Sequence, residues 1–196
     1  MAYRIVPVAE PVTNEDIDKY KALRLTSLKI DPSSFSSTYE REIAFTPEIW
    51  AQRLTSRFKR TFIASVKDEG SIGVGETWVG MISVLGPSEL IPATLEPFER
   101  AGVGADWDMY FVAGMWVHPE HRERGLGTSL VKAGLEWVQT NVDPINDSEG
   151  KRDKMVLLLV GDDNASGRAL YQKVGFTTLT SMPQAKGNSY MGLNVA

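Results

Sequence analysis

The stretch HPEHRERGLGTSL, His118–Leu130, is the part of this sequence that says most about the fold. It follows an uncharged run, Tyr110–Val117, that is typical of a buried strand, and a helical pattern extends from Gly125 to about Val142. Glycine costs roughly 1 kcal/mol relative to alanine inside a helix. Two glycines where a helix starts therefore indicate that something there needs the space of a side chain.

The start of a helix favours phosphate, because its first amides have no partner within the helix and the helix dipole adds partial positive charge. Gly125 and Gly127 would let a pyrophosphate approach these amides. Arg122 and Arg124 would add charge, and the Thr128 hydroxyl would donate a hydrogen bond. The alternative is a tight strand-to-helix turn with two solvated arginines.

The composition is that of one globular domain spanning residues 1–196, with 42% hydrophobic and 23% charged residues. A net charge of −4 argues against a nucleic-acid partner. The longest apolar run is far shorter than the roughly 20 residues that span a membrane, and the N-terminal segment lacks signal-peptide features, so we expect a cytoplasmic protein with no membrane partner. Cysteine is absent, and the two histidines, His118 and His121, lack a third ligand, so we expect no metal.

Hydrophobic periodicity predicts the element order β-α-α-β-β-β-α-β-α-β-β, which favours a mixed sheet with helices on both faces. The predicted strands cover residues 3–8, 61–66, 78–85, 110–117, 155–160, 176–180 and 189–194. The predicted helices cover residues 13–31, 46–57, 125–142 and 164–175. Residues 33–42 are interpreted as a polar loop and residues 86–108 as an irregular piece.

A second informative segment is Gly161–Phe176, GDDNASGRALYQKVGF. Asn164 is expected to cap a helix that ends at Gly175. Tyr171 follows Asn164 by two helical turns, so both side chains can line one groove. The inward face of this helix is predicted to consist of Ala165, Ala169, Leu170 and Val174, with Tyr171 off that stripe. The alternative is that Tyr171 only packs in the core.

Together the two segments resemble the GNAT superfamily of N-acetyltransferases. The first matches the family's acetyl-CoA motif as Arg122-Glu-Arg-Gly125-Leu-Gly127, after an apolar strand and a proline. The second matches its Asn…Ala-Leu-Tyr-x-Lys-x-Gly-Phe element through Asn164, Ala169, Leu170, Tyr171, Lys173, Gly175 and Phe176. Both motifs lie in the second half of the chain. The first half resembles the family more loosely, through Arg24 and the FSSTYERE loop.

The resemblance implies a mixed α/β fold whose seven-stranded, mostly antiparallel sheet splays open at strands 4 and 5. Acetyl-CoA would enter that gap as cosubstrate. Its implied contacts are the backbone of Met115, Trp116 and Val117, the turn residues Arg122, Glu123, Arg124, Gly125, Leu126, Gly127 and Thr128, and the side chains of Asn164, Tyr171 and Lys173. Tyr171 would donate to the leaving sulfur as a general acid. Because the chain has no cysteine, we expect direct transfer to an amine in a ternary complex.

The general base is a point where the chain departs from the family. Some members carry a glutamate on the fourth strand. Counting back from Arg122, the equivalent position in this chain lies near Phe111 and holds no glutamate. We expect Glu40, in the loop after the first helix, to take that role. Asp106, Asp108 and Glu76 are alternatives, and any of these carboxylates can equally be a solvated surface group.

The acceptor pocket is expected to use Phe35, Tyr39, Trp107 and residues 86–108. A small-molecule amine is the leading acceptor, with polyamines and protein N-termini left open. A non-catalytic acyl-CoA-binding module for sensing is the alternative function, favoured by the missing glutamate. An NAD-dependent oxidoreductase is disfavoured because Leu130 replaces the third glycine of the dinucleotide motif. A homodimer is expected from an edge strand near the C-terminus.

Overall fold

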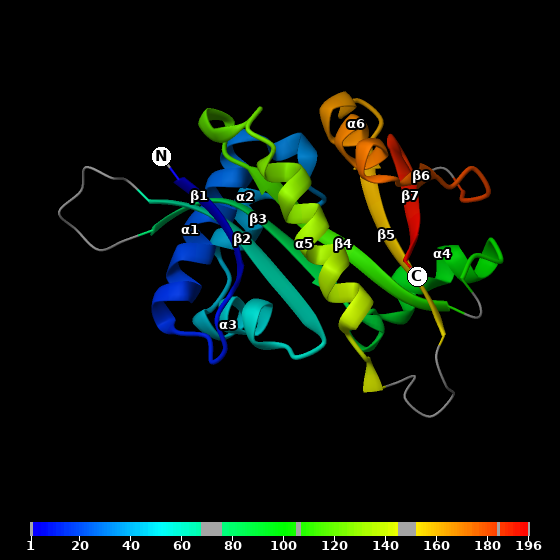
Figure 1. Cartoon of the computed structure of the whole chain (residues 1–196), viewed down its shortest axis with the longest axis horizontal. Coiled ribbons are helices and arrows are strands. Elements are labelled where there is room, and N and C mark those ends of the chain that lie inside the picture. Colours follow the sequence, from blue (N-terminus) through cyan, green and yellow to red (C-terminus); the bar gives the residue numbers. More distant parts are fainter. Residues whose placement is uncertain (1, 68–75, 105–106, 145–151, 184, 196) are drawn as a thin grey trace.

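The protein is described here by a computed structural model of residues 2–67, 76–104, 107–144, 152–183 and 185–195. Its seven-stranded sheet has the order β1-β2-β3-β4-β5-β7-β6 (Figure 1). The strands are β1 Ala2–Pro7, β2 Lys59–Lys67, β3 Glu76–Leu85, β4 Trp107–Val117, β5 Asp153–Gly161, β6 Thr177–Thr178 and β7 Asn188–Val195. β4 and β5 are parallel and the other neighbours are antiparallel, which confirms the predicted mixed, mostly antiparallel sheet.

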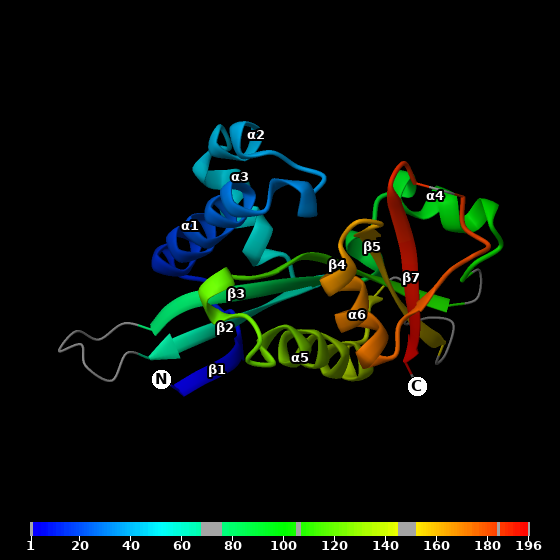
Figure 2. The same ribbon diagram turned by 90° about the horizontal axis from the view of Figure 1, so that it is seen from above.

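Helices cover both faces of this sheet, as predicted (Figure 2). The α-helices are α1 Asn14–Ile30, α2 Tyr39–Ile43, α3 Pro47–Thr55, α4 Pro92–Arg100, α5 Leu126–Thr140 and α6 Ala165–Val174. Short 3₁₀ turns are η1 Pro32–Ser34, η2 Pro87–Glu89 and η3 Pro119–His121. α1 to α4 lie on one face, and α5 packs with α6 on the other. A cavity at the sheet can therefore be walled by different helices on its two sides.

The helix α1 shows how local sequence sets up the site. Thr13 and Asp16 form a capping box, each accepting a hydrogen bond from the other's backbone amide. The buried face of α1 includes Tyr20 and Leu28 and, between them at helical spacing, the charged Arg24. A charge on an apolar stripe requires a buried partner, and this requirement decides how α2 docks.

The sheet opens between β4 and β5. Their parallel pairing runs from Trp107 opposite Asp153 to Phe111 opposite Leu157, although β4 continues to Val117. The register of β4 against β3 also shifts next to Gly114, whose φ of 62° is in the left-handed region that favours glycine. The predicted splay at strands 4 and 5 is therefore confirmed.

Two predicted irregular segments contain helices, so these predictions were wrong. Residues 33–42 include η1 and most of α2, and residues 86–108 include η2 and α4. The prolines of the second segment are compatible with its helix. Pro92 occupies the first turn of α4, where its missing N–H costs nothing, and Pro97 removes a single ladder bond near the end.

The helix α6 begins and ends as predicted, because Asn164 caps its start and Gly175 ends it with a φ of 112°. Its predicted inward face was partly wrong. Ala165 and Ala169 are exposed, and Tyr171 is the buried residue of α6. The large ring of Tyr171 is long enough to reach the core, whereas the methyl groups of Ala165 and Ala169 stay at the surface.

Among the described residues, no helix combines the length and apolar character needed to cross a membrane. The cytoplasmic location, the absence of a nucleic-acid partner and the homodimer stay predictions.

Candidate functional site

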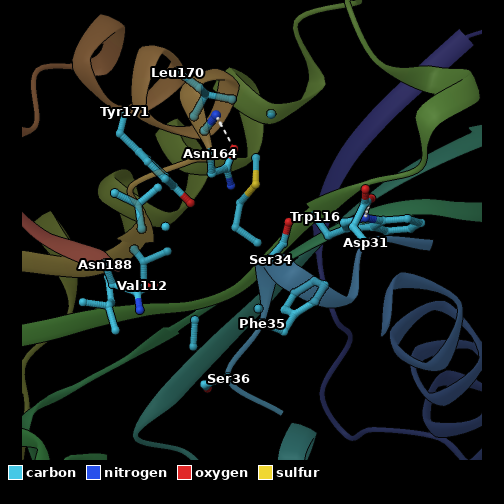
Figure 3. Close-up of a pocket in the computed structure, with 18 of the residues that line it drawn as sticks. Asp31, Ser34, Phe35, Ser36, Val112, Trp116, Asn164, Leu170, Tyr171 and Asn188 are labelled. Atoms are coloured by element: carbon cyan, nitrogen blue, oxygen red, sulfur yellow. Dashed lines mark hydrogen bonds between the residues drawn. The ribbon is translucent and has the colours of Figure 1, made fainter. Parts of the chain in front are cut away.

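A cavity of about 1020 Å³ occupies the gap between β4 and β5 (Figure 3). It passes from one helical layer to the other. Its wall on the α5 and α6 side includes Gly125, Leu126, Gly127, Thr128, Asn164, Gly167, Leu170 and Tyr171. Its wall on the other side includes Arg24, Phe35, Arg41, Glu42, Arg53, Thr94 and Pro97. Phe35 and Ser34 enter this space opposite Tyr171.

The turn before α5 presents free amides to the cavity. Gly125 has a φ of 78°, Glu123 has a φ of 61°, and α5 has no side-chain cap. The first amide to bond back is that of Ser129, at 3.0 Å from the Gly125 carbonyl oxygen. The amides of residues 126–128 are left without a partner in the described part of the chain. A Cβ at Gly125 would have no atom within 4 Å, so the approach to these amides is open, as an anion requires.

Gly127 lines the cavity and also lies at a close contact between helices. A Cβ there would lie 2.5 Å from Leu170 Cδ1 and 2.9 Å from Met115 Cε. The missing side chain thus permits close packing of α5 against α6 and β4, and its role in admitting a pyrophosphate stays a prediction.

The two arginines of the turn are placed differently. Arg122 lines the cavity, but its Nε donates to the Val117 carbonyl at 2.9 Å and its guanidinium pairs with Asp31. Asp31 also accepts a 2.6 Å hydrogen bond from Trp116 Nε1, which ties the end of α1 to β4. Arg124 is exposed over the Tyr3 ring and is not among the cavity-lining residues.

Asn164 and Tyr171 meet in the cavity, as their spacing predicted. Asn164 Oδ1 accepts the Gly167 amide at 2.9 Å and fixes the start of α6. The Tyr171 ring packs edge-on against Phe176, and its hydroxyl points toward the middle of the cavity between Asn164 and Val112 (Figure 3). Burial raises the pKa of Tyr171 to about 12. The hydroxyl is thus protonated at neutral pH and has no hydrogen-bond partner among the described residues.

Two arginines hold a buried carboxylate on the opposite wall. Glu42 is fully buried and accepts from Arg24 Nε and Nη2 at 3.0 and 2.8 Å. It also accepts from Arg53 Nη1 and Nη2 at 2.8 and 3.2 Å. Burial by itself would raise the pKa of Glu42, but the hydrogen bonds and charge of Arg24, with the charge of Arg53, outweigh it and lower that pKa. Glu42 therefore stays ionised and is a poor proton acceptor.

Arg24 is left with one unused end. Its Nη1 is buried and has no hydrogen-bond partner in the described structure. Leaving a buried donor unpaired costs about 1–3 kcal/mol, and more for a charged group. Arg24 is 7% exposed, and its guanidinium stacks 4.3 Å from the centre of the Phe35 ring.

The predicted base and its alternatives do not lie in this wall. Glu40 is exposed on α2 and is not among the lining residues, whereas Glu42, two residues later, is. Asp108 lies 3.5 Å from Arg152 near the start of β4, away from the gap. Glu76 pairs with Arg4 on the outer strands, and Asp106 lies outside the described residues.

Only some of the residues predicted to contact the acceptor or the adenosine end of acetyl-CoA line the cavity. Phe35 lines the cavity. Tyr39 packs beneath the Lys29 ammonium, 4.4 Å from its ring centre, and Trp107 lies at the far end of β4 from the gap. Lys173 is exposed in the last turn of α6. The latter three are not among the lining residues.

The sequence did not predict the Arg24–Glu42–Arg53 network, nor that a helix, α4, lines the cavity. A signal existed for the first, because Arg24 is placed on an apolar stripe where only a paired charge is stable. The sequence does not identify the partner, because Glu42 resembles the other charges of TYERE.

One group of three metal-ligating side chains occurs in the described residues. His118, Glu120 and His121 bring ligand atoms within 4.8 Å of one another. Both histidines use Nδ1 within the protein, His121 with the Tyr3 hydroxyl at 3.0 Å and His118 with the Glu120 amide at 3.4 Å. The absence of a metal stays a prediction.

Comparisons with known proteins agree with this geometry. A family model described as an acetyltransferase (GNAT) domain matches residues 93–178, which include both sequence motifs. The fold is similar to a GNAT-family acetyltransferase from Streptococcus pneumoniae, at 19% identity with full coverage of both chains and a TM-score of 0.63. No curated protein matches the sequence significantly.

Two other solved structures are similar over the whole chain. Arabidopsis thaliana NAA60, in complex with a bisubstrate analogue, is 13% identical with full coverage of both chains and a TM-score of 0.60. The Salmonella typhimurium protein yncA, with its cofactor acetyl-CoA, is 13% identical, with 100% of this chain and 95% of that chain covered and a TM-score of 0.58. At these identities the likeness to solved structures shows the fold. The chain therefore has the fold of these acetyltransferases, and its residues 93–178 match the acetyltransferase (GNAT) domain.

Proposed function

We propose that residues 1–196 act as one domain that transfers an acetyl group from acetyl-CoA to a primary amine of a small molecule or peptide, directly and in a ternary complex. The observation that carries this proposal is the gap between β4 and β5, with a phosphate-compatible turn at one side and the Tyr171 hydroxyl at its centre. A non-catalytic binding module would use the turn but has no need of that hydroxyl.

The chain's own groups fit acetyl-CoA. The free amides of residues 126–128 and the open approach at Gly125 suit a pyrophosphate. The edge of β4 beyond Phe111 has no partner on β5, so its backbone groups are available to an amide-containing chain such as pantetheine. When bound, acetyl-CoA supplies the acetyl group as an activated thioester.

Tyr171 is suited to donate a hydrogen bond more than to give up its proton. Its pKa is about 12, whereas an ordinary thiol has a pKa of about 8.5, and each pKa unit corresponds to 1.36 kcal/mol. Complete proton transfer from Tyr171 to a thiolate would thus be unfavourable by about 5 kcal/mol. A hydrogen bond from the protonated hydroxyl still stabilises charge that develops on the sulfur.

The amine has to lose a proton, and the carboxylates of the α1–α4 wall are poorly suited to take it. Asp31 is held by Arg122 and Trp116, and Glu42 by two arginines. We infer that the proton leaves through water in the cavity. Glu40, exposed on α2, is the alternative proton acceptor.

Thermal unfolding with saturating acetyl-CoA tests the cofactor, with NAD as control. A ligand at 100 times its dissociation constant adds about 2.7 kcal/mol, which raises the midpoint of a chain this size by about 5–10 °C. Stabilisation by acetyl-CoA followed by thiol release with an amine supports the proposal. Stabilisation without thiol release from any amine in a broad panel would indicate the binding module. Stabilisation by NAD alone would refute both.

A further inference from the structure

The α1–α4 side of the cavity is positively charged, although the chain as a whole carries −4. Arg24, Arg41 and Arg53 line it together with Glu42, so three arginines against one glutamate leave an excess of two positive charges. Asp31, at the edge of this wall, is neutralised by Arg122. A cationic wall of this kind repels a polyamine and attracts an anion.

Two of these arginines keep donors that the protein does not use. Arg41 is exposed on α2 and has no ion-pair partner in the described ranges. Arg24 gives Nε and Nη2 to Glu42, and its buried Nη1 has no partner there. A Cβ added to Gly114 would lie 3.9 Å from this Nη1, so the unused donor is next to the bulge of β4, at the start of the gap. The unused donor therefore lies beside the backbone where the acetyl group is expected.

The cavity lining also includes an apolar surface. It is formed by Pro97 of α4, Phe111 of β4, Leu159 of β5 and Tyr190 of β7. Leu159 is 39% exposed, which is unusual for a leucine at the centre of a sheet. The cavity thus offers both cationic groups and an apolar surface to an acceptor.

We propose that the acceptor is an apolar α-amino acid. Its carboxylate is bound by Arg24 Nη1 and Arg41, and its side chain packs against the apolar surface that includes Pro97 of α4. This inference rests on the proposed function. Glu42 positions Arg24 by holding its other two nitrogens, and a carboxylate completes the guanidinium with charge-assisted hydrogen bonds. Phe35 stacks on the face of the guanidinium, whereas the N–H donors lie in its plane, so the ring and a carboxylate can both contact Arg24.

Isothermal titration of the CoA-saturated protein tests carboxylate recognition separately from catalysis. The probes are N-acetyl-L-phenylalanine and N-acetyl-L-phenylalaninamide, which have the same side chain and differ in the charge. We expect the acid to bind at least tenfold more tightly than the amide. The Arg41→Gln variant should lose most of this preference. Arg100→Gln, an exposed arginine of α4 outside the cavity lining, should keep it.

Arg24→Lys keeps the positive charge but removes the fork of nitrogens, and we expect it to abolish the preference for the acid. If this buried variant fails to fold, Arg41→Gln still decides, because its side chain is exposed. Equal binding of acid and amide to the wild type, or binding of neither, would overturn the proposal. Acetyl-CoA stabilisation with equal kcat/KM for phenylalanine and phenylethylamine would overturn it while leaving the acetyltransferase intact. A lack of acetyl-CoA stabilisation would instead refute the proposed function itself.

Discussion

The buried carboxylate of Glu42 offers the sharpest test of how the α1–α4 wall of the cavity is held together. Glu42→Gln keeps the shape of the side chain but removes its charge. One of the two carboxylate oxygens is replaced by an NH2 group, which is a donor and faces the donors of an arginine. Four hydrogen bonds of 2.8–3.2 Å are thereby weakened or lost. Breaking a buried ion pair in this way costs about 3–5 kcal/mol. At about 2–4 °C per kcal/mol, the unfolding midpoint should fall by about 6–20 °C.

The matched control is Glu40→Gln, an exposed carboxylate two residues earlier on the same helix. It should change the free energy of unfolding by less than about 0.5 kcal/mol. The stabilisation that Glu42 contributes is fully present above the pKa of the unfolded chain, 4.5, and is lost as the pH falls through the lower pKa of the folded protein. The difference between wild type and Glu42→Gln should therefore shrink below pH 4.5. Urea unfolding at pH 7 and pH 3 measures it, and equal stability of the two variants at pH 7 would refute the reasoning.

Other predictions concern catalysis and the cofactor. Tyr171→Phe removes the hydrogen bond to the leaving sulfur and should lower kcat about 10²-fold or more while leaving acetyl-CoA affinity nearly intact, and an unchanged kcat in steady-state kinetics would make Tyr171 purely structural. Because its pKa is about 12, ionisation of Tyr171 should cause no fall in kcat/KM below pH 10. Glu40→Gln should leave kcat almost unchanged, and a large loss would restore Glu40 as the base. Gly125→Ala should weaken acetyl-CoA binding by calorimetry, whereas Gly102→Ala, also at positive φ with open space around it, should cost similar stability without affecting binding.

The sequence predicted the second half of the molecule well, because its signals are local. The uncharged strand, the glycine turn and the Asn164-capped helix each depend on neighbouring residues, and each forms where it was expected. Gly125 is a further example, because it was expected to leave space at the start of this helix and a Cβ there would have no atom within 4 Å.

The α1–α4 wall of the cavity was less predictable, because it depends on contacts between distant elements. Glu42 is buried only because Arg24, 18 residues earlier, and Arg53, 11 residues later, close on it. Glu40 has the same chemistry and a similar local sequence, but it lies on the solvent side of α2. Trp107 was assigned to the pocket from its aromatic character, and only the strand register reveals that it begins β4 at the far end.

The early end of the β4–β5 ladder gives this sheet inner edges in addition to its outer ones. Outer edges are usually short or protected, since unpaired strand backbone can template pairing with another chain. Here β6 spans only two residues, Thr177–Thr178, but the inner edge of β4 extends from Val112 to Val117. An occupant of the gap would cover that edge. We therefore expect acetyl-CoA to slow aggregation on heating as well as to raise the unfolding midpoint, because the same backbone that receives it is the strand most open to mispairing.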